Sequence, residues 1–226
     1  GIFVNLGNHG ANGIDYHVLT AEEGEIIADY LDSGNAVYLE GSDTWRRDEP
    51  TDAHPYFHIE GLADGESLEP PVVGLDGTFG EGMIFEEYEA DNNNFVDHIA
   101  PVDGSVAVFT FREGEEEFIG MVGLLSQTYR TIGCSYEFGG LVDGRRGNKA
   151  DLMERMVEFF RASPPDFPPP LNLSATTGDG EITLTWDHPR RAEGVMNREI
   201  LDLQHQIARL IPTRDGEKPD RETRKF

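Results

Sequence analysis

A clearly marked helix between two short apolar runs is the feature of this sequence that most restricts its fold. The helix is predicted to begin at Thr20, because Thr20 and Glu23 have the spacing of a capping box, in which each side chain accepts a hydrogen bond from the other residue's backbone amide. Apolar residues then repeat with helical spacing, and Gly34 stands where helices commonly end. Apolar runs at residues 2–7 and 36–39 flank this helix. The order strand, helix, strand predicts a βαβ unit with two parallel strands.

The residues up to 161 contain further strands and one more helix. Apolar or alternating runs predict strands at residues 72–75, 83–85, 105–111, 118–125 and 129–138. Residues 43–70 show little periodicity and are expected to form a long loop with short strands. Asn148 is placed to cap a final helix with a broad apolar face. Together these elements predict an α/β domain over residues 1–161, with a mostly parallel sheet flanked by helices.

Proline-rich residues 162–170 predict a stiff, extended linker after this domain. Residues 171–189 then show two alternating runs around a turn at Gly178-Asp179-Gly180. The tail, residues 190–226, is expected to hold an amphipathic helix. Two interpretations of this helix stay open: it packs on its own chain, or it supports self-association or the docking of a partner. Its apolar seam is spaced 4, 3, 4 and 3 residues apart and consists of Met196, Ile200, Leu203, Ile207 and Leu210.

Charge restricts the partners of this chain. The net charge is −25, and residues 1–189 hold 9 Lys and Arg against 36 Asp and Glu. So negative a body repels nucleic acid and anionic lipid, and no apolar run has the length of a membrane span. The chain begins with Gly1 and leads directly into an apolar run, which we interpret as a cut inside a longer precursor. These features predict an exported or cell-surface protein whose partners are other domains of the precursor or another protein chain.

Two segments resemble known domain types. Residues 171–189 resemble the opening strands of a fibronectin type III module, on Pro170, Leu171, Leu173, Ala175, the glycine turn, Ile182, Leu184, Trp186 and Pro189. Only a partial β-sandwich is expected, because the pattern ends far short of the length that closes two sheets. Residues 1–161 resemble class I glutamine-amidotransferase-like domains of secreted multidomain bacterial proteins, on residues 27–45 and 129–144. That resemblance implies an amidotransferase-like fold.

Candidate catalytic residues follow from this resemblance and from a second one, to caspase-like and gingipain-like peptidases. An amidotransferase nucleophile is a Cys on a tight turn after a strand, and this chain has Ser42 at the matching place. Caspase-like and gingipain-like peptidases place a His-Gly at a strand end, which matches His9-Gly10. Cys134, the single cysteine, lies inside an alternating apolar run and is predicted to be structural.

Two acidic segments are candidates for binding a metal ion. His54 and His58, with Asp48 and Asp52, offer one set of ligands. Asp91, Asn93 and Asp97 offer hard oxygen atoms for Ca²⁺, although their spacing differs from that of an EF-hand loop. No other cofactor is expected. The sequence therefore predicts a non-catalytic interaction or structural module, and the alternative is a cysteine- or serine-type hydrolase with His9 and Ser42 in its site.

Overall fold

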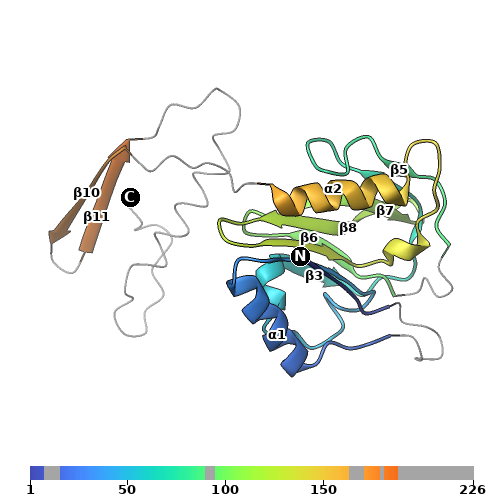
Figure 1. The fold of residues 1–226 in the computed structure, drawn as a ribbon, viewed down its shortest axis with the longest axis horizontal. Coiled ribbons are helices and arrows are strands. Elements are labelled where there is room, and N and C mark those ends of the chain that lie inside the picture. The colour runs from blue at the N-terminus through green and yellow to red at the C-terminus, as the bar shows by residue number, and fades with distance from the viewer. Residues whose placement is uncertain (8–15, 90–94, 163–170, 179–180, 188–226) are drawn as a thin grey trace. The chain divides into compact units, whose positions relative to one another are not determined.

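A computed structural model describes residues 1–7, 16–89 and 95–162, and the backbone of residues 171–178 and 181–187 (Figure 1). The chain divides into two compact units, Gly1–Pro165 and Asp166–Phe226. In the first unit the helices are α1 (Ala21–Asp32) and α2 (Lys149–Arg161), with the 3-10 turns η1 (His54–Phe57) and η2 (Phe138–Gly140). Its strands are β1 (Ile2–Asn5), β2 (Ala36–Glu40), β3 (Ile59–Ala63), β4 (Glu69–Gly74), β5 (Ile84–Phe85), β6 (His98–Pro101), β7 (Val106–Glu113), β8 (Glu116–Leu125) and β9 (Arg130–Cys134).

The predicted βαβ unit at the start of the chain is confirmed. Strands β1 and β2 pair in parallel, with Phe3 opposite Tyr38, and α1 connects them. Both ends of α1 have the expected geometry. Thr20 is its N-cap in an extended conformation, and Gly34 follows its last turn with a φ of +83°, a left-handed conformation that glycine adopts without a steric penalty.

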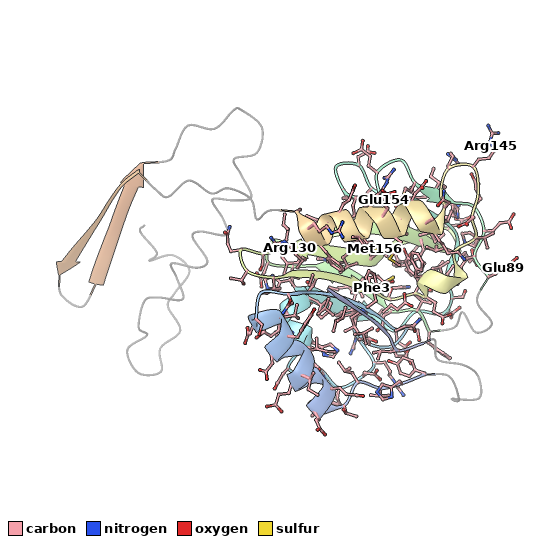
Figure 2. The ribbon with its side chains drawn as sticks, in the orientation of Figure 1. Phe3, Glu89, Arg130, Arg145, Glu154 and Met156 are labelled. Atoms are coloured by element: carbon pink, nitrogen blue, oxygen red, sulfur yellow. The ribbon has the colours of Figure 1, made fainter. Side chains whose placement is uncertain are left out.

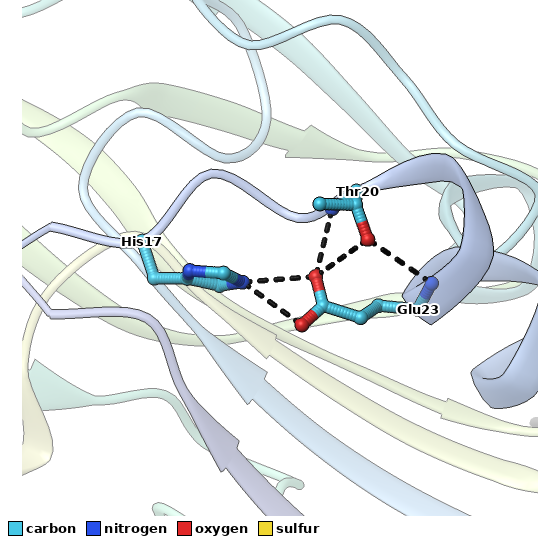
Figure 3. A network of polar contacts seen from close by, with 3 residues as sticks. All are labelled: His17, Thr20 and Glu23. Carbon is cyan, nitrogen blue, oxygen red and sulfur yellow. Dashed lines mark hydrogen bonds and ion pairs between the residues drawn. The ribbon is translucent and has the colours of Figure 1, made fainter.

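The capping box of α1 is complete (Figure 3). The Thr20 amide donates to Glu23 Oε2 at 2.9 Å, and the Glu23 amide donates to Thr20 Oγ1 at 3.3 Å. His17 Nε2 also lies 2.9 Å from Glu23 Oε2. The replacement of Thr20 by Ala is expected to lower the free energy of unfolding by about 1 kcal/mol, because the first turn loses its side-chain acceptor. Urea denaturation measures the change, and Thr20→Ser, which retains the hydroxyl, should stay close to the wild type.

The prediction of a mostly parallel sheet flanked by helices is wrong. The nine strands form one mixed sheet with the path β1-β2-β9-β8-β7-β4-β5, to which β3 and β6 are added through the β6–β8 pairing. Only the β1–β2 and β2–β9 pairs are parallel among the described strands of this sheet, and every other pair is antiparallel. The reason is the length of the connections. A turn at Gly114, with a φ of +62°, joins β7 directly to β8, whereas parallel neighbours need a crossover of a dozen or more residues.

Helices cover both faces of the strands β2 and β9, one helix on each face (Figure 1). Successive side chains of a strand point to opposite faces, so neighbouring residues of β2 belong to different cores. On the α2 side, Tyr38 joins a cluster that includes Val108, Phe111, Ile132, Cys134, Leu152 and Met156. On the α1 side, Val37 and Leu39 join a cluster that includes Ile27, Leu31, Trp45, Phe57, Ile99 and Val122.

The predicted final helix is also confirmed as α2. The Asn148 side chain caps it by accepting a hydrogen bond from the Asp151 amide at 2.8 Å. At the other end, the guanidinium of Arg130 donates to the Ala162 carbonyl at 2.9 Å (Figure 2). The same guanidinium donates to the carbonyls of Ser126 and Tyr129, so it connects the end of α2 to the turn between β8 and β9.

The described part of the second unit is a β-hairpin. Strands β10 (Leu171–Gly178) and β11 (Glu181–Asp187) pair in antiparallel fashion at the positions that the sequence pattern predicted. Residues 163–170 of the predicted linker, and the tail with its apolar seam, lie outside the described residues. In the described part of the chain, no helix is long and apolar enough to cross a membrane.

Candidate functional site

Three aspartates from distant parts of the sequence meet at one end of the β3–β6 pair. Each of Asp43, Asp64 and Asp97 contributes a carboxylate oxygen, and these oxygens lie within 4.8 Å of one another. Asp64 directly follows β3 and Asp97 directly precedes β6, and the neighbouring residues Ala63 and His98 are register partners in that antiparallel pair. Asp43 lies in the turn after β2. The pairing of β3 with β6 therefore brings Asp64 and Asp97 together, and the turn adds Asp43.

Asp97 holds the turn in place through its side chain. Its Oδ2 accepts hydrogen bonds from the amides of Trp45 and Arg46, both at 2.8 Å. Its own amide donates to the Ser42 carbonyl at 3.0 Å. Asp97 is 0 % exposed, and its second oxygen, Oδ1, is buried and has no hydrogen-bond partner among the described residues.

Burial and neighbouring charge both act on this carboxyl. Burial raises the pKa of Asp97 to about 7, the negative charges of Asp43 and Asp64 act in the same direction, and the two amide hydrogen bonds counteract part of the effect. Asp43 is also buried, whereas Asp64 is exposed. The cluster is thus a buried pair of carboxylates with a third at the solvent boundary.

Close backbone packing fixes the spacing of the strand ends that carry Asp64 and Asp97. A Cβ atom on Gly65 would lie 2.4 Å from the Val96 carbonyl oxygen. Only glycine allows this approach without displacement of the backbone. The cluster is therefore part of the packed structure and does not lie on a freely projecting loop.

A solvent-open hollow of about 450 Å³ lies beside the cluster and is lined by Arg46, Arg47, Leu62, Ala63 and Asp64. Both arginines are exposed, and the structure records no ion pair between either guanidinium and a described carboxylate. Leu62 is a large apolar side chain exposed to solvent. In a strongly acidic domain, this hollow combines the positive charge of two arginines with apolar surface and with the carboxylate of Asp64.

The candidate nucleophiles are deeply buried. Ser42 and Cys134 are both 0 % exposed, and burial raises the pKa of the Cys134 thiol well above its usual value. The Cys134 thiol donates to the Tyr136 carbonyl at 3.1 Å. His9 lies outside the described residues, and so do Asp91 and Asn93. Of the predicted calcium ligands, the structure therefore describes Asp97 alone.

The other proposed metal ligands are not brought together. The Nδ1 of His54 accepts from the Thr51 amide at 2.8 Å, and its Nε2 lies 2.9 Å from the Thr44 carbonyl oxygen, so both ring nitrogens have protein partners. His58 Nδ1 lies 2.8 Å from the Asp103 carbonyl oxygen. Asp48 accepts a hydrogen bond from the hydroxyl of Tyr16. These side chains serve the packing of the loop after β2.

The sequence pattern did not point to Asp43 and Asp64 as ligands. Asp43 has the signature of a turn residue, and Asp64 lies in the stretch whose lack of periodicity predicts a loop. Comparisons with protein-family models, with curated proteins and with solved structures found no match. The fold and the cluster thus define a mixed-sheet domain with a buried acidic site, and the resemblances to amidotransferase-like and fibronectin type III domains stay predictions.

Proposed function

We propose that residues 1–162 form a non-catalytic interaction or structural module of an exported or cell-surface protein. The observation that supports this proposal best is the complete burial of Ser42 and Cys134. A nucleophile must reach the substrate and must have a base within hydrogen-bond distance. Ser42 is buried in a turn, and Cys134 lies in a central strand and has a raised pKa. Neither side chain is therefore accessible to a substrate.

The alternative function is a cysteine- or serine-type hydrolase that uses His9 and Ser42. It requires the hydroxyl of Ser42 to become exposed. The Ser42 carbonyl accepts the Asp97 amide, and Asp97 in turn accepts the amides of Trp45 and Arg46. Exposure of Ser42 would therefore disturb several hydrogen bonds at once, which favours the non-catalytic function.

For the interaction role, the hollow beside Arg46 and Arg47 is the surface with the most suitable chemistry. Two guanidiniums without ion pairs to described carboxylates favour an acidic group of a partner. The exposed Leu62 adds apolar contact area. Such a surface fits an acidic segment of another domain or of another protein chain.

Covalent probes test the proposal directly. The native chain is expected to react with neither a fluorophosphonate, which labels activated serines, nor iodoacetamide, because Ser42 and Cys134 are inaccessible. After denaturation, iodoacetamide should label one site per chain, since the sequence has one cysteine. Intact-mass spectrometry counts the adducts. Stoichiometric fluorophosphonate labelling of native Ser42, abolished in Ser42→Ala, would instead establish the hydrolase.

A further inference from the structure

We propose that Asp43, Asp64 and Asp97 bind a divalent cation, with calcium as the preferred ion. The ion would connect the turn after β2, the end of β3 and the start of β6. This site goes beyond the proposed function, because its presence does not depend on whether the module is catalytic.

The unsatisfied Oδ1 atom of Asp97 is the feature that points to a bound ligand. The residue is completely buried, Oδ2 is held by two amides, and Oδ1 has no hydrogen-bond partner among the described residues. Buried carboxylate oxygens are otherwise paired, hydrogen-bonded or bound to metal. Two further carboxylates at the same place make a bound cation a fitting partner for Asp97 Oδ1.

The nature and spacing of the ligands favour calcium. All three are carboxylates, which suit hard cations such as Ca²⁺ and Mg²⁺ and do not select zinc or copper. Two oxygens that bind Ca²⁺ at its usual distance lie at most roughly 4.6–5.2 Å apart, whereas Mg²⁺ requires at most roughly 4.2 Å. Oxygens within 4.8 Å of one another fall inside the span that calcium allows.

The exposed side of the cluster determines the expected affinity. Asp64 is exposed, so water molecules can complete the six to eight ligands that calcium takes. Few protein ligands and an open side are typical of sites that bind calcium in the range of about 0.1–1 mM, as extracellular modules do. An exported protein meets calcium at such concentrations, so the expected affinity agrees with the proposed location.

Terbium luminescence tests the site in the full chain. Tb³⁺ replaces Ca²⁺ and emits when a nearby tryptophan is excited, and the Trp45 amide lies 2.8 Å from Asp97 Oδ2. In a Trp186→Phe background Trp45 is the remaining tryptophan of the sequence. The chelator-treated protein is expected to sensitise Tb³⁺, and Ca²⁺ in large excess over Tb³⁺ should compete with it, with Mg²⁺ less effective.

A matched pair of variants locates the binding. Asp64→Asn removes one exposed carboxylate from the cluster, and Asp76→Asn removes an exposed carboxylate elsewhere. Asp64→Asn should lower the apparent affinity for Ca²⁺ at least about tenfold, while Asp76→Asn should leave it unchanged. Asp97→Asn is expected to abolish sensitised emission, and its circular dichroism spectrum reports whether it folds.

Thermal unfolding gives a second readout. Ca²⁺ should raise the melting temperature of the wild type and of Asp76→Asn more than NaCl of equal ionic strength does, because an ion that binds the folded state stabilises it. Asp64→Asn should lose that excess. Equal shifts with Ca²⁺ and NaCl, or terbium emission that Asp64→Asn leaves unchanged, would overturn the proposal.

Discussion

The replacement of Glu40 by Gln is expected to stabilise the first unit by about 3 kcal/mol at pH 8, and to change its stability little at pH 4. Glu40 is only 2 % exposed. Burial raises its pKa to about 7, although hydrogen bonds from the Tyr38 hydroxyl and the Phe138 amide favour the charged form. The ionised carboxylate is therefore less stable in the folded chain than in the unfolded chain.

The direction of this pH dependence follows from the two pKa values. The ordinary pKa of 4.5 applies to the unfolded chain, and the folded value is about 7. Below pH 4.5 the group is protonated in both states, and its contribution to stability is fully present. As the pH rises through 7, the folded state must give up its proton and that contribution is lost. The amide of the Glu40→Gln variant does not titrate. The difference in the free energy of unfolding between variant and wild type should therefore increase from pH 4.5 to pH 7 and level off above pH 7.

Urea denaturation at a series of pH values measures this difference. Glu87→Gln, the same substitution on an exposed side chain, serves as the control. Its free energy of unfolding should differ from that of the wild type by a small amount that is the same at every pH. If the stability gain of Glu40→Gln does not change with pH, Glu40 titrates alike in both states and its carboxyl is not buried as described.

Local signals in the sequence were sufficient for the first 40 residues. The capping box of Thr20 and Glu23, the apolar stripe of the helix and Gly34 all lie within one short stretch. A connection that contains a helix permits parallel pairing of its flanking strands, so local patterns determined the topology of β1 and β2 as well. The Asn148 cap of α2 was predictable for the same reason.

The rest of the sheet could not be predicted in this way. Strands β4, β5, β7, β8 and β9 lie close to the predicted positions, but the order and direction of strands depend on pairings between distant residues. The turn at Gly114 joins β7 to β8, and strands joined by so short a turn pair in antiparallel fashion. The resemblance to amidotransferase-like domains led to the wrong sheet.

The acidic cluster shows the same limit. The sequence pattern predicted Asp97 as a Ca²⁺ ligand, together with Asp91 and Asn93. Asp64 joins it only because β3 pairs with β6, and β3 lies in residues 43–70, which show little periodicity. A buried ligand set that assembles from three separate segments has no spacing that a single sequence can reveal.

The second large effect is expected at Gly61, the residue of β3 that lies against the turn carrying Asp43. A Cβ atom at this position would lie 2.0 Å from the Trp45 carbonyl oxygen and 2.9 Å from the Arg46 Cα. Both are backbone atoms and cannot rotate away as a flexible side chain would. Gly61→Ala must therefore move either β3 or the turn.

Neither segment is free to move. The Trp45 indole donates to the Cys134 carbonyl at 3.0 Å and packs against Phe57, with ring centroids 5.1 Å apart. Gly61 is paired with Ile99 in the β3–β6 ladder. The introduced methyl group should thus strain the packing and weaken the amide hydrogen bonds to Asp97, at a cost of more than about 3 kcal/mol, which is at the upper end for overpacked sites.

Urea denaturation followed by circular dichroism measures this cost. If Gly61→Ala does not unfold cooperatively, the substitution has disrupted the folded packing, which agrees with the prediction. Gly144→Ala is the matched control, because a Cβ atom there meets nothing within 4 Å, and its free energy of unfolding should stay within about 0.5 kcal/mol of the wild type. The expected order is therefore wild type, closely followed by Gly144→Ala, with Gly61→Ala far below both. Equal stability of the two alanine variants would mean that β3 does not approach the turn this closely, and the convergence of Asp43 with Asp64 and Asp97 would lose its structural basis.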